Sequence, residues 1–192
     1  MGLASSEFSP GYYPGPSVTQ IQGIVGANLL LGKPVTASSA YNANFVPSTV
    51  TDGLANEFAF ADDDSTRSMF INGFDSAVNL IRIWAVNDRF PSTVMIESTT
   101  VANSTNPGDY TTLATVANPV FNSQGFMDVA VNASAGTQGL EFLFGPGSNA
   151  PGTGISEIQA FATGQVVPEP PSIALVACGV TSLLAYAWRK RK

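Results

Sequence analysis

A two-residue hydrophobic period recurs in short runs between about Ala27 and Thr163 and constrains the fold more than any other feature. Apolar side chains alternate with polar or small ones over residues 127–132, and over residues 140–144 three apolar side chains share the face opposite Glu141. Such a period places alternate side chains on opposite faces of a β-strand. Turn sequences rich in Pro and Gly separate the runs, at residues 106–109, 145–147 and 151–154. The pattern predicts an all-β sandwich or barrel.

Two further runs refine this prediction. Residues 80–86 are apolar on both faces apart from Arg82, which is typical of a central strand covered on both sides. Residues 93–99 alternate again, with Val94 and Ile96 on one face and Glu97 on the other. No long helical period and no internal repeat interrupt the strands. We therefore expect one β-domain with extensions at both ends.

Composition excludes several kinds of chemistry. The chain of 192 residues contains no histidine, which rules out Ser-His-Asp and Cys-His nucleophile systems and His-ligated zinc. Its single cysteine, Cys178, permits no disulfide within the chain. Residues 1–166 hold four basic and thirteen acidic side chains, a net charge of −9. A body this acidic repels phosphate backbones, so we expect no binding to nucleic acid.

The C-terminus carries the opposite charge. Residues 173–188 contain no charged side chain and are followed by four cations, Arg189 to Lys192. As a helix the run would span about 24 Å, so it predicts a short transmembrane helix whose basic end stays in the cytoplasm. The domain would then lie outside the cytoplasm. The alternative is a buried C-terminal helix of a soluble domain.

A proline-rich strip precedes the apolar run, with Pro168, Glu169 and Pro170 at its centre. A Pro-Glu-Pro motif, a short apolar helix and a basic cluster, in this order, resemble the bacterial PEP-CTERM sorting signal. The resemblance implies that an exosortase-type membrane peptidase recognises Pro168, Glu169 and Pro170 and processes the protein during delivery to the cell surface. A plain single-pass anchor is the alternative. Residues 1–26 contain no secretory signal and are expected to form a flexible leader. The expected organisation is a leader (1–26), a β-domain (27–163), a linker (164–172), a membrane helix (173–188) and a basic tail (189–192).

Several segments of the β-region resemble landmarks of one family. Residues 28–39 (NLLLGKPVTASS) resemble the opening of a discoidin domain, also called coagulation factor 5/8 type C or family 32 carbohydrate-binding module. Residues 49–53 resemble its Asp-Gly loop, Leu80 to Trp84 its central strand, and Ile155 to Phe161 its closing strand. The resemblance implies a galactose-binding-like jelly-roll β-sandwich. The family's usual tryptophan after the Asp-Gly loop is absent, and the candidates to fill its space are Phe58, Phe60 and Phe70.

The same resemblance implies a structural calcium ion. Asp52 and Glu157 would supply carboxylates, because calcium prefers six to eight oxygen ligands. Main-chain oxygens would come from Thr49, Leu54 and Ser156, with a further oxygen near Ser65 or Thr66. Two interpretations without a metal stay open. In these, Asp52 only caps its own turn, and Glu157 pairs with Arg67 or Arg82.

Ligand recognition is expected on a loop at one end of the sandwich. Asn87, Asp88, Arg89 and Phe90 combine hydrogen-bonding side chains with an aromatic ring that could stack on a sugar. Phe58 or Phe60 could add a second stacking face. The alternative places Phe90 in the core and Arg89 on the surface. A further acidic run, Asp62-Asp63-Asp64, is expected to be a solvated loop because successive side chains point in different directions.

These features predict an exported, non-catalytic protein of the cell surface or extracellular matrix that binds an extracellular polysaccharide or other glycan. A structural matrix or adhesion protein without sugar affinity is the first alternative. A glycan-active enzyme with an unrecognised carboxylate pair is the second.

Overall fold

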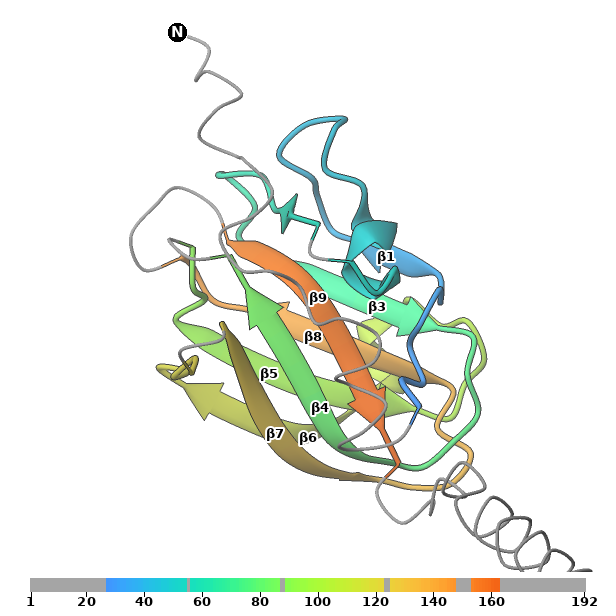
Figure 1. The fold of residues 1–192 in the computed structure, drawn as a ribbon. Helices are drawn as coiled ribbons and strands as arrows, with labels where there is room; N and C mark the ends of the chain where they lie inside the picture. The colour runs from blue at the N-terminus through green and yellow to red at the C-terminus, as the bar shows by residue number, and fades with distance from the viewer. Residues whose placement is uncertain (1–26, 55, 87–88, 123–124, 148–152, 163–192) are drawn as a thin grey trace, which may run out of the picture.

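The computed structural model describes residues 27–54, 56–86, 89–122, 125–147 and 153–162. In this part of the chain two antiparallel sheets pack face to face as a β-sandwich (Figure 1). The five-stranded sheet has the order β1-β3-β8-β5-β6 and the four-stranded sheet the order β2-β9-β4-β7. The strands are β1 (Val35–Ala37), β2 (Phe58–Ala59), β3 (Ser68–Asn72), β4 (Val78–Ala85), β5 (Thr93–Thr99), β6 (Thr111–Ala117), β7 (Phe126–Ala133), β8 (Gly139–Phe144) and β9 (Gly154–Phe161).

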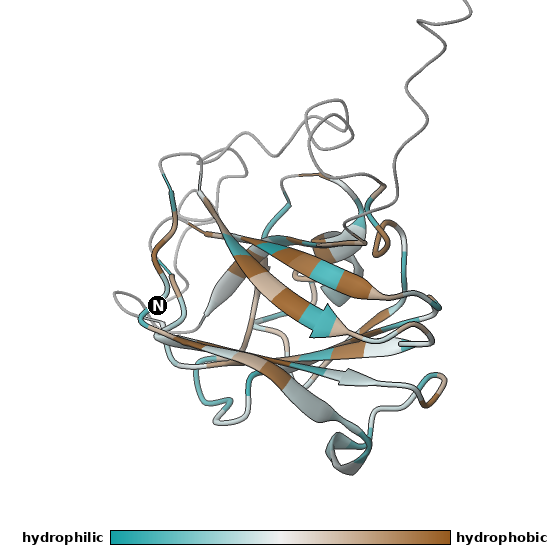
Figure 2. Cartoon of the chain, turned by 90° about the horizontal axis from the view of Figure 1, so that it is seen from below, coloured by the Kyte–Doolittle hydropathy of each residue, from teal (hydrophilic) through white to brown (hydrophobic). Residues whose placement is uncertain are grey.

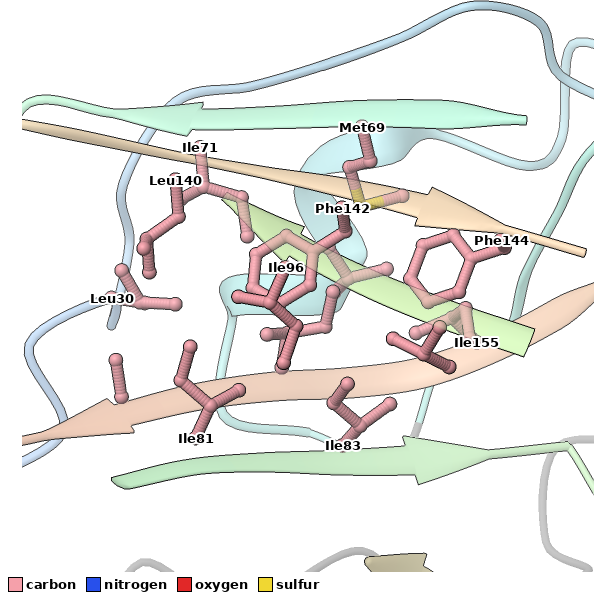
Figure 3. Close-up of a cluster of buried hydrophobic side chains, with 14 of the residues drawn as sticks. Leu30, Met69, Ile71, Ile81, Ile83, Ile96, Leu140, Phe142, Phe144 and Ile155 are labelled. Carbon is pink, nitrogen blue, oxygen red and sulfur yellow. The ribbon is translucent and has the colours of Figure 1, made fainter. Parts of the chain in front are cut away.

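The predicted alternation creates the core. Along β8, Leu140 and Phe142 point between the sheets and are fully buried, and Ile96 of β5 lies beside them. Ile81 and Ile83 of β4 meet them from the opposite sheet (Figure 3). Bands of hydrophobic and hydrophilic residues alternate along the strands, as Figure 2 shows. Burial of these side chains is the main favourable term for folding, because each stabilises the folded state by about 1.5–3 kcal/mol.

The sandwich confirms the predicted all-β fold. The run at 93–99 forms β5 and the run at 80–86 forms most of β4, which lies between β9 and β7 as a central strand should. The runs at 127–132 and 140–144 lie within β7 and β8. Strands β1, β2, β3 and β6 were not among the predicted runs.

The two ends of the sandwich have different roles. At one end, which we call the loop end, β4, β6 and β8 finish and β5, β7 and β9 begin. At the other end the described chain enters and leaves side by side, since the Leu29 amide donates a hydrogen bond to the Ala160 carbonyl at 2.8 Å. Two 3-10 helices complete the fold, η1 (Pro47–Thr51) and η2 (Pro107–Asp109).

The predicted leader, linker, sorting motif and membrane helix lie outside the described residues. Among the residues that the structure does describe, none of the helices is long and apolar enough to cross a bilayer. The predicted membrane anchor therefore stays a prediction.

Candidate binding face and cation site

Two aromatic rings form a stacked pair at the loop end. The rings of Phe90 and Phe121 lie 4.7 Å apart between centroids, with 14° between their planes. Phe90 follows β4 and Phe121 precedes β7, so the pairing of these two strands brings the loops together. Both side chains are half-buried. The loop end thus presents a partly exposed, flat apolar surface. Polar side chains lie in the same loops, and Asn118 and Asn122 are exposed to solvent.

The predicted ligand loop is only partly a surface feature. Asn87 and Asp88 lie outside the described residues. Arg89 is 7% exposed, so the alternative of a surface cation is wrong. Its guanidinium Nη1 lies 3.9 Å from Glu57 Oε1, and its main chain pairs with Val86 and Gly154. Arg89 therefore supports the loop from below, whereas Phe90 stays accessible above it.

The prediction that Phe58 or Phe60 adds a second stacking face is wrong. Phe58 and Phe60 have no exposed surface and pack edge to face with 5.0 Å between their centroids. Their burial follows from the pairing of β2 with β9, which carries both rings into the core. Phe58 and Phe60 are therefore core residues, whereas Phe70 lies on the outer face of the other sheet against Tyr110.

Phe121 was missed because its run, Pro119-Val120-Phe121-Asn122, has no two-residue period. The available signal was a phenylalanine in a turn flanked by Pro and Asn, where a buried strand is not expected.

The acidic run at 62–64 contains one structural carboxylate. Asp62 and Asp63 are exposed, as expected for a solvated loop. Asp64 instead accepts hydrogen bonds from the hydroxyls of Ser38 and Ser39 and from two backbone amides of its own loop. Partial burial would raise its pKa, but these four donors outweigh that effect and lower the pKa to about 2. Asp64 thus ties the 61–67 loop to the end of β1.

Asp52 and Glu157 are brought together, as the calcium prediction requires. Asp52 follows η1, and Glu157 lies in β9, against which η1 packs. Glu157 is fully buried, and neither of its carboxylate oxygens has a partner at hydrogen-bonding geometry among the described residues. Burial, and then the nearby charge of Asp52, raise the pKa of Glu157 to about 9, although the Gly53 amide and the Gln159 side chain oppose part of the rise.

The interpretations without a metal explain only Asp52. Its carboxylate accepts a hydrogen bond from the Leu54 amide and one from the Asn56 side chain, both at 2.8 Å, as a turn cap does. Among the described residues neither Arg67 nor Arg82 pairs with Glu157, whose carboxylate oxygens have no hydrogen-bond partner, and Arg82 pairs with Asp128 at 2.7 Å instead. The predicted pairing of Glu157 with Arg67 or Arg82 is therefore wrong.

The residues present fit a hard cation. An unpaired carboxylate buried beside a second carboxylate is costly, and a cation would remove that cost. Thr49 and Leu54 stand in the turn that carries Asp52, and Ser156 precedes Glu157, so their main-chain oxygens belong to the same region. Ser65 and Thr66 are exposed in the Asp64 loop instead. Across the described ranges no three or more Asp, Glu, His or Cys side chains converge, so such a site would depend on main-chain oxygens.

Comparison with solved structures identifies the fold of this chain, whereas comparison of its sequence identifies no family. No protein-family model matches the chain, and no curated protein matches it. Among solved structures, chitosan-binding module 1 of a chitosanase/glucanase from Paenibacillus sp. IK-5 is 24% identical, with a TM-score of 0.57 over 71% of this chain and 99% of the module. Module 2 of that enzyme, solved with chitotriose, is 19% identical, with a TM-score of 0.61 over 70% and 100%.

A third neighbour is the CBM32 module of AlyQ, solved in complex with 4,5-unsaturated mannuronic acid. It is 18% identical, with a TM-score of 0.53 over 68% of this chain and 95% of the module. The described domain therefore has the jelly-roll sandwich fold of carbohydrate-binding modules, and it spans nearly the full length of each of these three.

Proposed function

We propose that the domain is a non-catalytic carbohydrate-binding module that holds a glycan on its loop end. The observation that carries this proposal is the stacked Phe90–Phe121 pair, half-exposed where the loops of β4 and β7 meet. The C–H face of a sugar ring packs well on a flat aromatic surface, and neighbouring polar groups fix its orientation. The buried ion pair of Arg89 and Glu57 beneath the loop holds that surface in place.

Charge narrows the class of glycan. Residues 27–162 carry twelve acidic and four basic side chains, a net charge of −8. Two of the four cations, Arg82 and Arg89, are buried beside carboxylates. An acidic surface repels polyuronates and attracts amine-bearing sugars. We therefore expect a neutral or amine-bearing glycan, in the manner of a chitosan-binding module, rather than a uronic acid polymer.

Calorimetric titration of the full chain tests this proposal with three probes: trimers of glucosamine, of N-acetylglucosamine and of mannuronic acid. Phe90→Leu and Phe121→Leu remove the flat rings and keep an apolar side chain, so each should weaken binding about tenfold, close to the value of one stacking contact. Phe126→Leu is the matched control, because this half-buried ring faces Trp84 on the outer face of the sheet. It should bind as the wild type does.

The alternatives give different results in the same titration. Absence of binding to any of the three glycans would favour a structural matrix or adhesion protein. An equal loss of glycan affinity in all three variants would show that the Phe90–Phe121 pair is not the binding surface. Release of smaller sugars during incubation would favour a glycan-active enzyme.

We also propose a structural calcium ion in the turn after η1. Asp52 and Glu157 would hold it with their carboxylates, and Thr49, Leu54 and Ser156 with main-chain oxygens. The buried, unpartnered carboxylate of Glu157 supports this proposal. The ion would neutralise two adjacent negative charges and join the turn to β9.

The tail leads to a proposal about location. We propose that residues 173–188 anchor the protein in a membrane with the domain outside the cytoplasm, and that an exosortase-type peptidase recognises Pro168, Glu169 and Pro170. The uncharged run and the four terminal cations support the anchor. Fractionation of producing cells, followed by mass measurement of the C-terminus, tests both parts. An uncleaved chain in the membrane fraction would argue against processing, and an intact chain in the cytosol against both.

A further inference from the structure

Two glutamates face each other in the middle of the five-stranded sheet. Glu97 of β5 and Glu141 of β8 are directly opposite in the antiparallel register. Their neighbours Ile96, Leu140 and Phe142 point into the core, so both carboxyl groups lie on the outer face of the sheet. Like charges in this position destabilise a pair of strands. The pairing therefore needs something that removes one of the two charges.

Glu141 is sealed although it lies on an outer face. It has no exposed surface, and neither carboxylate oxygen has a hydrogen-bond donor among the described residues. Tyr110 lies over this part of the face, because its ring packs on Phe70, the residue directly opposite Glu141 on β3. Gly139, which precedes Glu141 on the same face, leaves a gap in which the Tyr110 hydroxyl lies, and that hydroxyl donates to the Ser104 carbonyl at 2.7 Å.

The Tyr110 cap belongs to a compact loop, residues 100–110. Asn72 of β3 donates to the Ser104 carbonyl at 3.0 Å, and the Tyr110 ring packs on Phe70 with 5.5 Å between centroids. Within the loop, the Ser104 hydroxyl donates to Asp109 at 2.6 Å. The loop is thus attached to the sheet around Glu141 and can respond to its charge.

The groups that face Glu141 offer no positive charge. Among the described residues they are Phe70 on β3, Glu97 on β5 and Tyr110 from the capping loop. Asp109, an exposed carboxylate of the same loop, acts on Tyr110 rather than on Glu141. On β6 the Thr112 hydroxyl donates to Glu97 Oε1, which marks Glu97 as the acceptor of the pair. No lysine or arginine lies in this set.

A metal ion would not find ligands here. Carbonyls of β3, β8 and β5 are used in the ladder hydrogen bonds of the sheet, in the plane of the strands. Calcium needs six to eight oxygens, and the two carboxyl groups supply four at most. A proton requires only a donor oxygen and an acceptor oxygen.

We propose that Glu97 and Glu141 share one proton, with Glu141 as the carboxylic acid that donates to the Glu97 carboxylate, and that loss of this proton to water opens the Tyr110 cap. The cap and the pair together would form a pH-sensitive device on the outer face of the five-stranded sheet. This inference is independent of the proposed glycan site, which lies at the loop end.

The electrostatics agree with this geometry. Burial, and then the charge of Glu97, raise the pKa of Glu141 from 4.5 to about 7. The pKa of Tyr110 rises to about 12, mainly through burial, so the phenol stays neutral throughout. With the cap open, Glu141 is hydrated and its pKa returns towards 4.5. Opening therefore becomes easier as the pH rises from about 4.5 to about 7 and changes little above that value.

Hydrogen exchange of the full chain tests the proposal at about pH 5 and about pH 8, with rates corrected for the intrinsic effect of pH. Within the capping loop the Tyr110 amide bonds to the Pro107 carbonyl and the Asp109 amide to the Asn106 carbonyl, so both report on the cap. Their protection should fall about tenfold or more between the two conditions, while β4 and β9 change little. Constant protection of the cap would overturn the proposal.

Three variants separate the pair from other causes. Glu141→Gln keeps the shape and a donor to Glu97 without a titrating group, so its cap should stay protected at both pH values. Asp128→Asn, on the other sheet, should keep the wild-type response. Gly139→Ala places a methyl group against Asn72 Oδ1 and 3.1 Å from the Tyr110 hydroxyl, so its cap should exchange quickly at both pH values. A pH response that survives in Glu141→Gln or in Gly139→Ala would overturn the proposal.

Two further measurements use the unmodified protein. Side-chain carboxyl NMR should show Glu141 titrating near neutral pH, and a midpoint below about pH 5 would contradict the shared proton. Millimolar calcium should leave the cap unchanged at about pH 8. Restored protection in calcium would show that the pair holds a cation instead of a proton.

Discussion

Glu157 and Glu141 are both fully buried glutamates beside a second carboxylate, yet their surroundings differ. Glu157 lies against the turn after η1, where the chain is irregular. Glu141 lies in the middle of a sheet, between β3 and β5, where the ladder uses the carbonyl oxygens. The excess negative charge of two adjacent carboxylates can thus be neutralised in two different ways.

The comparison shows that backbone setting decides what can neutralise a buried acid. Irregular backbone has carbonyl oxygens to offer, so a pair such as Asp52 and Glu157 can hold a cation. Regular backbone has none, so a pair such as Glu97 and Glu141 can only share a proton. Asp64 represents a third setting, in which four hydrogen-bond donors stabilise the ionised carboxylate.

The largest expected effect is the response to calcium. Removing calcium with a chelator should leave Glu157 buried without a cation, so the free energy of unfolding should fall by about 3 kcal/mol relative to calcium at about a hundredfold excess over its Kd. Urea unfolding with and without chelator measures this difference. Glu157→Gln should abolish the response, whereas the matched change Glu141→Gln should keep it. If the chelator does not change the stability of the wild type, Asp52 and Glu157 do not hold a cation.

The second effect is a dependence of stability on pH. Because the pKa of Glu141 is raised in the folded state, its contribution is complete below pH 4.5 and is lost as pH rises to about 7. The loss should be at most about 3 kcal/mol, at about 1.36 kcal/mol per pH unit.

The difference between wild type and Glu141→Gln, measured by urea unfolding in saturating calcium, isolates this contribution. Calcium is needed because Glu157 also titrates, with a raised pKa, in the metal-free protein. Parallel curves for the two proteins would mean that folding does not raise the pKa of Glu141.

The smallest effect concerns Asp64. Its lowered pKa means that its contribution is present above about pH 3.8 and is lost as pH falls through about 2. Asp64→Asn should destabilise the fold by about 1–2 kcal/mol at neutral pH, because a neutral amide accepts these hydrogen bonds less strongly. Asp63→Asn, at an exposed neighbour, should change the melting temperature little. Equal effects of the two changes would show that the Asp64 hydrogen bonds do not stabilise the loop.

The fold could be predicted where one face of a strand is apolar. Strands β4, β5, β7 and β8 each carry a run that the sequence makes visible, whereas β9 was expected only from the resemblance of residues 155–161 to a discoidin closing strand. Strand β3 escaped prediction because Phe70, which packs on Tyr110, lies between Ser68 and Asn72 on the outer face and breaks the alternation of this short strand. Strand β6, TTLATVA, lies at a sheet edge, where alternation is weak.

The sites were predictable to the extent that they depend on local motifs. The Asp-Gly turn and the closing strand located Asp52 and Glu157. Glu57 beneath Arg89, Phe121 on Phe90 and Glu97 opposite Glu141 each depend on a long-range pairing. A shift of one residue in strand register would move any of these side chains to another face. Such pairs therefore cannot be derived from the spacing of residues along a single chain.

The neighbouring positions of Leu29 and Ala160 have a consequence for how the domain can be displayed. The first and last strands of the described domain thus have their outer ends at the end of the sandwich opposite the Phe90–Phe121 surface. The domain can thus be inserted into another polypeptide, or placed at the end of an extended linker, without the chain having to pass along the side of the sandwich. In either arrangement the stacked rings face away from the support.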